Sequence, residues 1–113
     1  MYYYGLGVPQ EDTQAMFWYR KAAEQDDAEA QDALGYLYDS GRDVYRDYAQ
    51  AALWYRRAAE QGDADTQESL GYLYYKGKGV PQDDAQAAAW WRKAAEQGYA
   101  GAQRLLGSLY LYG

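Results

Sequence analysis

The feature that most constrains this chain is a repeat with a period of 36 residues. The tetrapeptide Ala-Ala-Glu-Gln begins at Ala22, at Ala58 and at Ala94. Two further groups keep the same spacing: Trp18, Trp54 and Trp90, and the pairs Leu34-Gly35, Leu70-Gly71 and Leu106-Gly107. A fixed period of this size is typical of a solenoid, in which each unit buries its apolar face only against its neighbours. The period therefore predicts an elongated array and points to a binding scaffold.

Each period contains the pattern of two helices joined by short connections. The first type, helix A, is expected at about 28–39, 64–75 and 100–112. The second type, helix B, is expected at about 12–25, 48–61 and 84–97, and residues 1–4 align with the last turn of a further, partial helix A. The sequence thus predicts an all-α solenoid of about three 36-residue helix-turn-helix repeats, in a single domain over residues 1–113.

Small residues predict how these helices pack. Gly35, Gly71 and Gly107 fall in the middle of the A helices. A glycine there costs roughly 1 kcal/mol relative to alanine, so we expect another helix to approach closely as compensation. The three tryptophans of the repeat would fill the wider gaps, and we expect them in the core. At the helix ends, Gly62 and Gly98, with Asp26 in the first copy, occupy positions where a left-handed residue is expected.

Composition argues against several classes of function. The net charge is -6, with 11 basic and 17 acidic residues, which disfavours binding to nucleic acid or to an anionic membrane surface. No apolar run approaches the roughly 20 residues of a membrane-spanning helix. The chain has no cysteine and no histidine, so the usual nucleophilic triads and zinc sites are excluded. We therefore predict no catalytic residues, no metal site and no cofactor.

Every A helix carries a stripe of residues spaced by 3, 4 and 3 on the side away from the expected core. The ten stripe residues that we predict to bind a partner are Glu29, Asp32, Tyr36, Asp39, Asp65, Glu68, Tyr72, Tyr75, Arg104 and Ser108. Carboxylates beside tyrosines suit a peptide that carries Lys or Arg, since the rings add packing and cation–π contact. The alternative is a solvated acidic face that only aids solubility.

Three motifs carry a resemblance to a known family. They are Ala28-x-Ala30-Gln31-x-x-Leu34-Gly35-x-x-Tyr38, Gly77-x-Gly79-Val80-Pro81 and Ala87-x-x-Trp90-Trp91-x-Lys93-Ala94-Ala95-Glu96-Gln97-Gly98. With them the chain resembles the Sel-1-like repeat, a relative of the tetratricopeptide repeat with a longer loop between its helices. The resemblance implies an α/α right-handed superhelix whose A helices line the concave face. It also implies an adaptor that holds other proteins together. The departures from the pattern are local: Asp43 and Tyr45 in the middle loop, Thr66, and Tyr99 and Ser108 in the last unit.

The sequence therefore favours a non-enzymatic scaffold that binds a protein or peptide, of basic character, on the concave surface of its A helices. One alternative is a structural module that self-assembles head to tail, because Gly113 is equivalent to Gly5 after three periods. That contact would displace Met1 to Tyr4, which share a register with Leu109 to Tyr112. A piece excised from a longer array would explain the same ends. A carbohydrate or cell-wall binder that uses exposed tyrosines is a further alternative, and compartment and partner identity stay open.

Overall fold

The computed structural model describes residues 8–41 and 46–112, with side chains from residue 14 onward. The described part of the chain forms six α-helices and no strand. They are α1 (Val8–Ala23), α2 (Ala28–Ser40), α3 (Tyr48–Glu60), α4 (Ala64–Lys76), α5 (Asp84–Glu96) and α6 (Ala100–Tyr112). The partial helix expected over residues 1–4 and the middle loop at residues 42–45 lie outside the described residues.

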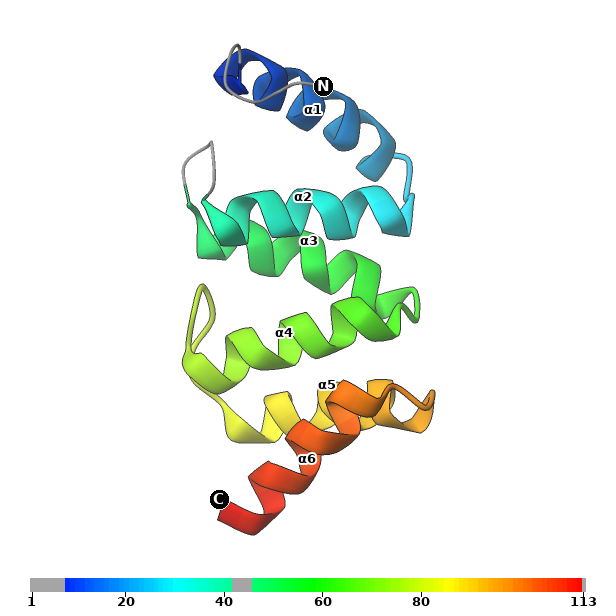
Figure 1. Cartoon of the computed structure of the whole chain (residues 1–113), viewed down its shortest axis with the longest axis vertical. Helices are drawn as coiled ribbons and strands as arrows, with labels where there is room; N and C mark the ends of the chain where they lie inside the picture. The colour runs from blue at the N-terminus through cyan, green and yellow to red at the C-terminus, as the bar shows by residue number, and fades with distance from the viewer. Residues whose placement is uncertain (1–7, 42–45, 113) are drawn as a thin grey trace.

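The helices stack along one axis into an elongated body of 46 × 24 × 23 Å. Figure 1 shows α2, α4 and α6 in one layer, with α3 and α5 in a second layer behind them. Helices contact mainly their neighbours in the chain, and the pairs α2–α3 and α4–α5 have the most extensive contacts. This confirms the predicted all-α solenoid of helix-turn-helix repeats, in which each unit is covered by the next.

The A helices of the sequence analysis correspond to α2, α4 and α6, and the B helices correspond to α1, α3 and α5. Helix α1 begins at Val8, four residues before the start expected from the repeat at Asp12, whereas Val80 and Pro81 in the third copy precede α5. Pro9 is tolerated because the first N–H groups of a helix have no intrahelical acceptor.

Aspartates precede α2 to α5, and a residue with a left-handed backbone follows each helix from α1 to α5. Asp47, Asp63 and Asp83 accept hydrogen bonds from backbone N–H groups of the first turn, whereas the side chain of Asp27 makes no such bond. Asp63 is thus an N-cap with a side-chain hydrogen bond, and Asp27 is an N-cap without one. The turn after each B helix has a left-handed residue, at Asp26, Gly62 and Gly98, as predicted.

Close approach at the A-helix glycines is confirmed for two of the three. A Cβ atom on Gly35 would lie 2.5 Å from the ring of Tyr55, and one on Gly71 would lie 2.5 Å from Trp91 Nε1. Both rings come from the B helix that follows in the same repeat. Nothing described lies within 4 Å of a Cβ placed on Gly107. The glycine at this position thus makes room for one aromatic side chain per complete repeat.

The expectation that all three repeat tryptophans are buried is wrong for Trp18. Trp54 packs with Ala23, Ala30 and Leu34 from the two preceding helices and is buried. Trp90 is buried in the equivalent way in the larger cluster around α3, α4 and α5. Trp18 is 61% exposed, because no described A helix precedes α1 to cover it.

Five glutamines link neighbouring helices and form what we call the glutamine ladder. Its members are Gln31, Gln61, Gln67, Gln97 and Gln103. Gln31 and Gln67 are buried, and their Nε2 groups donate to the carbonyls of Ala23 and Ala59, at 3.0 and 3.1 Å. Gln61 and Gln97 in turn donate to the side-chain oxygens of Gln31 and Gln67. Buried amides of this kind are stable because their polar groups are paired.

The B helices also carry a repeated arginine that packs between helices. Arg20 donates to Tyr38 Oη at 2.6 Å, and Arg56 and Arg92 make the equivalent contacts with Tyr74 and Tyr110. The guanidinium groups of Arg20 and Arg56 also lie over the rings of Trp54 and Trp90, at 5.8 and 5.9 Å from the centroids. These arginines therefore help to join one repeat to the next.

Candidate functional site

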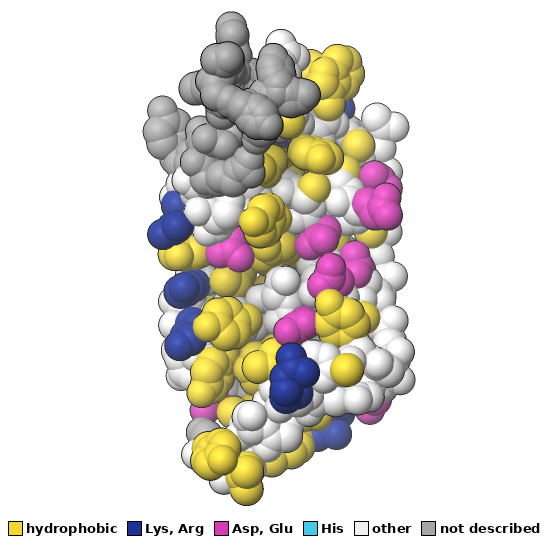
Figure 2. Space-filling view, in the orientation of Figure 1, with side chains coloured by type: hydrophobic (Ala, Val, Ile, Leu, Met, Phe, Trp, Pro, Cys, Tyr) yellow, Lys and Arg dark blue, Asp and Glu magenta, His cyan; other side chains and the backbone are white. Residues whose placement is uncertain are grey.

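The surface made by α2, α4 and α6, which we call the A-helix face, contains all ten residues predicted to bind a partner. Figure 2 shows Asp and Glu side chains gathered over α2 and α4, with hydrophobic side chains among them. Seven of the ten are exposed: Glu29, Tyr36, Asp65, Tyr72, Tyr75, Arg104 and Ser108. The other three, Asp32, Asp39 and Glu68, are half-buried. Their role in binding stays a prediction.

Four carboxylates on α2, on α4 and at the N-cap of α4 lie close enough to repel one another. Burial raises the pKa of Asp32, and the nearby charges of Asp65 and Asp63 raise it further. Burial also raises the pKa of Glu68, with a second contribution from Asp65 and a partial offset from Arg104. No ion pair within the described ranges joins these carboxylates to a basic side chain. The centre of the A-helix face therefore holds negative charge that the described residues do not neutralise.

Thr66, one of the departures from the repeat, lies beneath this charge. It stands where the other A helices have Ala30 and Ala102, and it is fully buried. Its Oγ1 has no hydrogen-bond partner by distance and angle among the described residues, although it lies near enough to Asp32 to oppose the rise in that carboxyl's pKa. A buried hydroxyl without a partner is uncommon in folded proteins.

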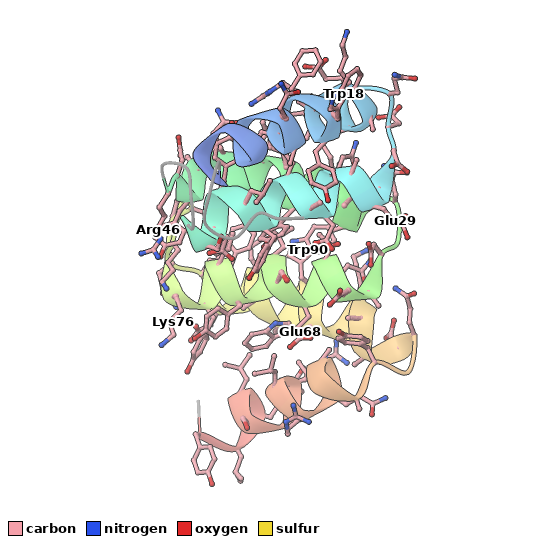
Figure 3. All side chains as sticks on the ribbon, turned by 45° about the horizontal axis from the view of Figure 1, so that its top comes forward. Trp18, Glu29, Arg46, Glu68, Lys76 and Trp90 are labelled. Atoms are coloured by element: carbon pink, nitrogen blue, oxygen red, sulfur yellow. The ribbon has the colours of Figure 1, made fainter. Side chains whose placement is uncertain are left out.

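The side chain of Glu68 lies between α4 and α6, as Figure 3 shows. A Cβ on Gly101 would lie 3.2 Å from Glu68 Oε1, so the absence of a side chain at Gly101 leaves room for the carboxylate. Glu68 also lines a shallow pocket of about 220 Å³ together with Asp39, Ser69 and Tyr72, which we call the acidic pocket. Two carboxylates and one aromatic ring thus share a depression on the A-helix face.

Two aromatic residues of the stripe, Tyr72 and Tyr75, already contact other side chains of the protein. Tyr72 and Tyr75 are exposed, and the Lys76 ammonium lies 5.7 and 5.9 Å from the centroids of their rings. Tyr75 also lies next to Trp91, with the ring centroids 5.6 Å apart. A second depression of about 230 Å³, the apolar pocket, brings two predicted site residues together with side chains from α5 and α6. It is lined by Tyr75, Trp91, Leu105, Ser108, Leu109 and Tyr112.

Several residues that position the site come from outside the A helices and were not predicted. Tyr55 of α3 donates to Asp39 Oδ2 at 3.2 Å, and Tyr99 donates to Asp65 Oδ1 at 2.7 Å. The Asp65 hydrogen bond raises the pKa of Tyr99 to about 12, whereas burial is the main cause that raises the pKa of Tyr55. The sequence contained one signal for the position of Tyr55, because a large aromatic residue follows both Gly35 and Gly71 at a spacing of 20.

The structure does not bring the whole stripe into one site. Asp39, Glu68 and Tyr72 share the acidic pocket, whereas Tyr75 and Ser108 line the apolar pocket. In the described part of the chain nothing joins Glu29 to the other stripe residues. The A-helix face is thus an acidic centre on α2 and α4, with an aromatic and apolar margin toward α6.

Other kinds of site find no support in the described part of the chain. No group of three or more His, Cys, Asp or Glu residues there has the arrangement of a metal site. None of the described helices is long and apolar enough to cross a membrane.

The repeats match a known family over the whole chain. The profile of the Sel1 repeat matches residues 1–27, 28–63, 64–99 and 100–113. No curated protein matches the chain.

Solved structures show the same fold. The chain is 46% identical to c5321 of uropathogenic Escherichia coli, described as a protective antigen with an SLR fold, with a TM-score of 0.84 over 87% of the chain. It is 37% identical to a Sel1 repeat protein of Oxalobacter formigenes, with a TM-score of 0.73 over 90% of the chain. It is 32% identical to the cysteine rich protein B (hcpB) of Helicobacter pylori, with a TM-score of 0.79 over 84% of the chain. The chain spans 21%, 44% and 71% of those three proteins.

Proposed function

The chain belongs to the Sel1 repeat family, whose members are generally protein-interaction scaffolds, and we propose that its A-helix face binds a peptide segment rich in Lys or Arg. The proposed binding residues are those of the acidic centre and its margin. The module itself is non-enzymatic in this proposal and requires no cofactor. The partner is a protein, in the same chain or in another, that offers an extended or helical basic segment.

The observation that carries the proposal is the unneutralised negative charge on α2 and α4. The pKa values of Asp32 and Glu68 are raised, which means that the folded chain holds these carboxylates in an unfavourable environment for their ionised forms. A Lys or Arg side chain placed among them would remove part of that penalty. A surface that costs folding free energy without stabilising a neighbour is more typical of a binding site than of a structural contact.

The shape of the acidic pocket supports the same ligand chemistry. Its volume of about 220 Å³ is too small for a folded element but is suited to one long side chain. Asp39 and Glu68 would bind the cationic group, and the Tyr72 ring would contact the aliphatic part of the side chain. Cations over exposed aromatic rings contribute about 0.5–1 kcal/mol each, so several such contacts are needed for useful affinity.

Selection from a random peptide library on the purified chain tests this proposal. We expect the bound peptides to be enriched in Lys and Arg and to lose at least tenfold in affinity for the variant Asp32→Lys/Glu68→Lys. Binding should also weaken as salt is added, because exposed charges are screened. The matched control is Glu24→Lys/Glu96→Lys, which makes the same change in net charge on exposed residues of the B-helix side.

Two results would contradict the proposal. The first is a set of selected peptides without enrichment in basic residues. The second is equal binding by both double variants, with helical circular dichroism spectra and melting unchanged. Glycan titrations followed by intrinsic fluorescence provide a separate check of the carbohydrate alternative, for which the proposal expects no response.

A further inference from the structure

Three basic side chains lie at the side of the stack where α2 and α4 end. They are Arg46 before α3, Lys76 in the last turn of α4 and Lys78 in the loop that follows, and we call them the basic edge. Figure 3 shows Arg46 and Lys76 at the same edge of the stack and Glu29 at the opposite one. Apart from Arg104, all other described basic residues lie on the B helices.

The loop after α4 packs against the start of α3 and thereby brings two of these cations together. Gly79 has a positive φ of 78°, and a Cβ atom there would collide with the carbonyl of Tyr48. In this arrangement Lys78 Nζ lies 5.1 Å from the centroid of the Tyr48 ring, and the guanidinium carbon of Arg46 lies 5.6 Å from the same centroid. Two cations from different segments therefore share one aromatic ring.

The charges of the basic edge are not neutralised by the part of the chain that the structure describes. No ion pair there joins any of the three to a carboxylate. Arg46 donates to the carbonyl of Ser40 at 3.0 Å, a contact that leaves its positive charge in place. Arg46 and Lys76 are exposed, and Lys78 is half-buried. Positive charge is thus available to a partner at this edge.

Stabilisation of helix ends does not account for these cations. A basic residue in the last turn of a helix is favourable because it interacts with the helix dipole. The last turns of α2 and α6 nevertheless contain no basic residue, and Ser40 and Tyr112 stand at the positions equivalent to Lys76. Likewise, Gln82 is the equivalent of Arg46 in the next repeat. The basic edge therefore departs from the repeat at two of its three positions.

Helix α4 connects the basic edge with the acidic pocket. Glu68, Tyr72 and Lys76 are each four residues apart and therefore lie along one side of the helix. Glu68 and Tyr72 line the acidic pocket, and the Lys76 ammonium lies 5.7 Å from the centroid of the Tyr72 ring. With a rise of 1.5 Å per residue, the backbone positions of Glu68 and Lys76 are about 12 Å apart. Opposite charges are thus presented on the two sides of one aromatic ring.

We propose that the A-helix face and the basic edge together bind one extended peptide in which a Lys or Arg and an Asp or Glu are four residues apart. This inference rests on the proposed function, because the basic residue of the peptide is the one that enters the acidic pocket. An extended chain advances about 3.3 Å per residue and alternate side chains share a face, so residues four apart are about 13 Å apart on one face. That distance matches the separation of Glu68 and Lys76. The carboxylate of the peptide binds Lys76 and Lys78, and the peptide follows α4.

A peptide library with one fixed Lys and random residues on both sides tests this spacing. On the unmodified chain we expect Asp and Glu to be enriched four residues from the Lys, on one side of it, and at no other position. Exchange of that acidic residue for Gln in a selected peptide should weaken binding about fivefold, the upper range for an exposed ion pair. The variant Lys76→Glu/Lys78→Glu should instead select Lys or Arg at this position. The matched control is Lys21→Glu/Lys93→Glu, which makes the same change in net charge on exposed residues of the B helices and should keep the acidic preference.

The outcomes separate this inference from the proposed function. Peptides that lose affinity for Asp32→Lys/Glu68→Lys, but show no acidic preference four residues from the Lys, would overturn the inference and leave the proposed function in place. Peptides that do not bind the unmodified chain would overturn both. The inference also fails if the basic-edge variant selects the same peptides as the unmodified chain. The exchange of Glu for Gln in the peptide requires no change in the protein, so it gives an answer even if a variant is unstable.

Discussion

Replacing Gly71 by alanine should destabilise the fold, although alanine is the better helix former. An added Cβ would lie 2.5 Å from Trp91 Nε1, 2.6 Å from the adjacent ring carbon and 3.2 Å from the carbonyl oxygen of Ala87. The indole of Trp91 is buried and donates to the carbonyl of Glu68 at 3.1 Å, so it cannot move without losing this bond. The contact with the carbonyl oxygen of Ala87 involves the backbone of α5, so this contact could be relieved only if the whole helix moved.

The magnitude follows from three contributions. Forcing an extra carbon into a packed interface costs roughly 1–3 kcal/mol. Loss of the hydrogen bond between Trp91 and Glu68 costs about 1 kcal/mol more. The higher helix propensity of alanine returns about 1 kcal/mol. The sum is a decrease of roughly 1–3 kcal/mol in the free energy of unfolding for Gly71→Ala. For Gly107→Ala, which meets nothing, only the propensity gain of about 0.5–1 kcal/mol remains.

Urea denaturation followed by far-ultraviolet circular dichroism measures the difference between the two variants. With a slope near 2 kcal/mol per molar urea, the midpoints of the two variants should differ by about 1 M or more. A Gly71→Ala chain as stable as the unmodified one would refute the reasoning that an aromatic ring fixes this glycine. The same conclusion would follow if both variants changed stability in the same direction.

Two further predictions concern buried polar groups. Gln67→Leu should lower the free energy of unfolding by about 2 kcal/mol, because it removes two hydrogen bonds of about 1 kcal/mol each, the one to the carbonyl of Ala59 and the one from the amide of Gln97. An unchanged urea midpoint would contradict a structural role for the ladder. Asp32→Asn should raise the thermal midpoint at pH 7. The folded chain raises the pKa of Asp32 above its unfolded value, so ionisation of this carboxyl destabilises the fold. The variant's advantage should therefore shrink as the pH falls below the folded pKa and vanish below the unfolded one. A variant advantage that grows toward acid would show the opposite sign of coupling.

The fold could be predicted because the sequence repeats the same helix-turn-helix pattern three times. The period identified the solenoid, and the glycine at position 35 and its equivalent at 71 predicted close helix approach that the structure confirms. The same reasoning failed for Trp18, because burial in a solenoid depends on the neighbouring unit and not on the residue itself. A repeat equivalence therefore predicts the environment of a residue only where both neighbouring units are present.

The candidate site was harder to predict for a different reason. Spacing on one helix correctly placed the stripe residues on a solvent-facing side, but it could not show which residues of different helices meet. The pairs Tyr55–Asp39 and Tyr99–Asp65 depend on the rotation of α3 and on the turn before α6, which the period does not determine. The raised pKa of Asp32 likewise depends on the distance between α2 and α4.

The glutamine ladder has a consequence for how the array unfolds. Gln31, Gln67 and Gln103 each donate to a backbone carbonyl in the B helix of the preceding unit, so the loss of one unit removes a partner from the next. Coupling of this nearest-neighbour kind makes a linear array cooperative over short distances and lets it fray from its ends. Among the described helices α1 is the weaker end, since the Gln25 side chain donates to Lys21 of α1 itself and Trp18 is exposed. Amide protons of α3 and α4 should consequently exchange last, and α1 should open and close many times for each global unfolding event.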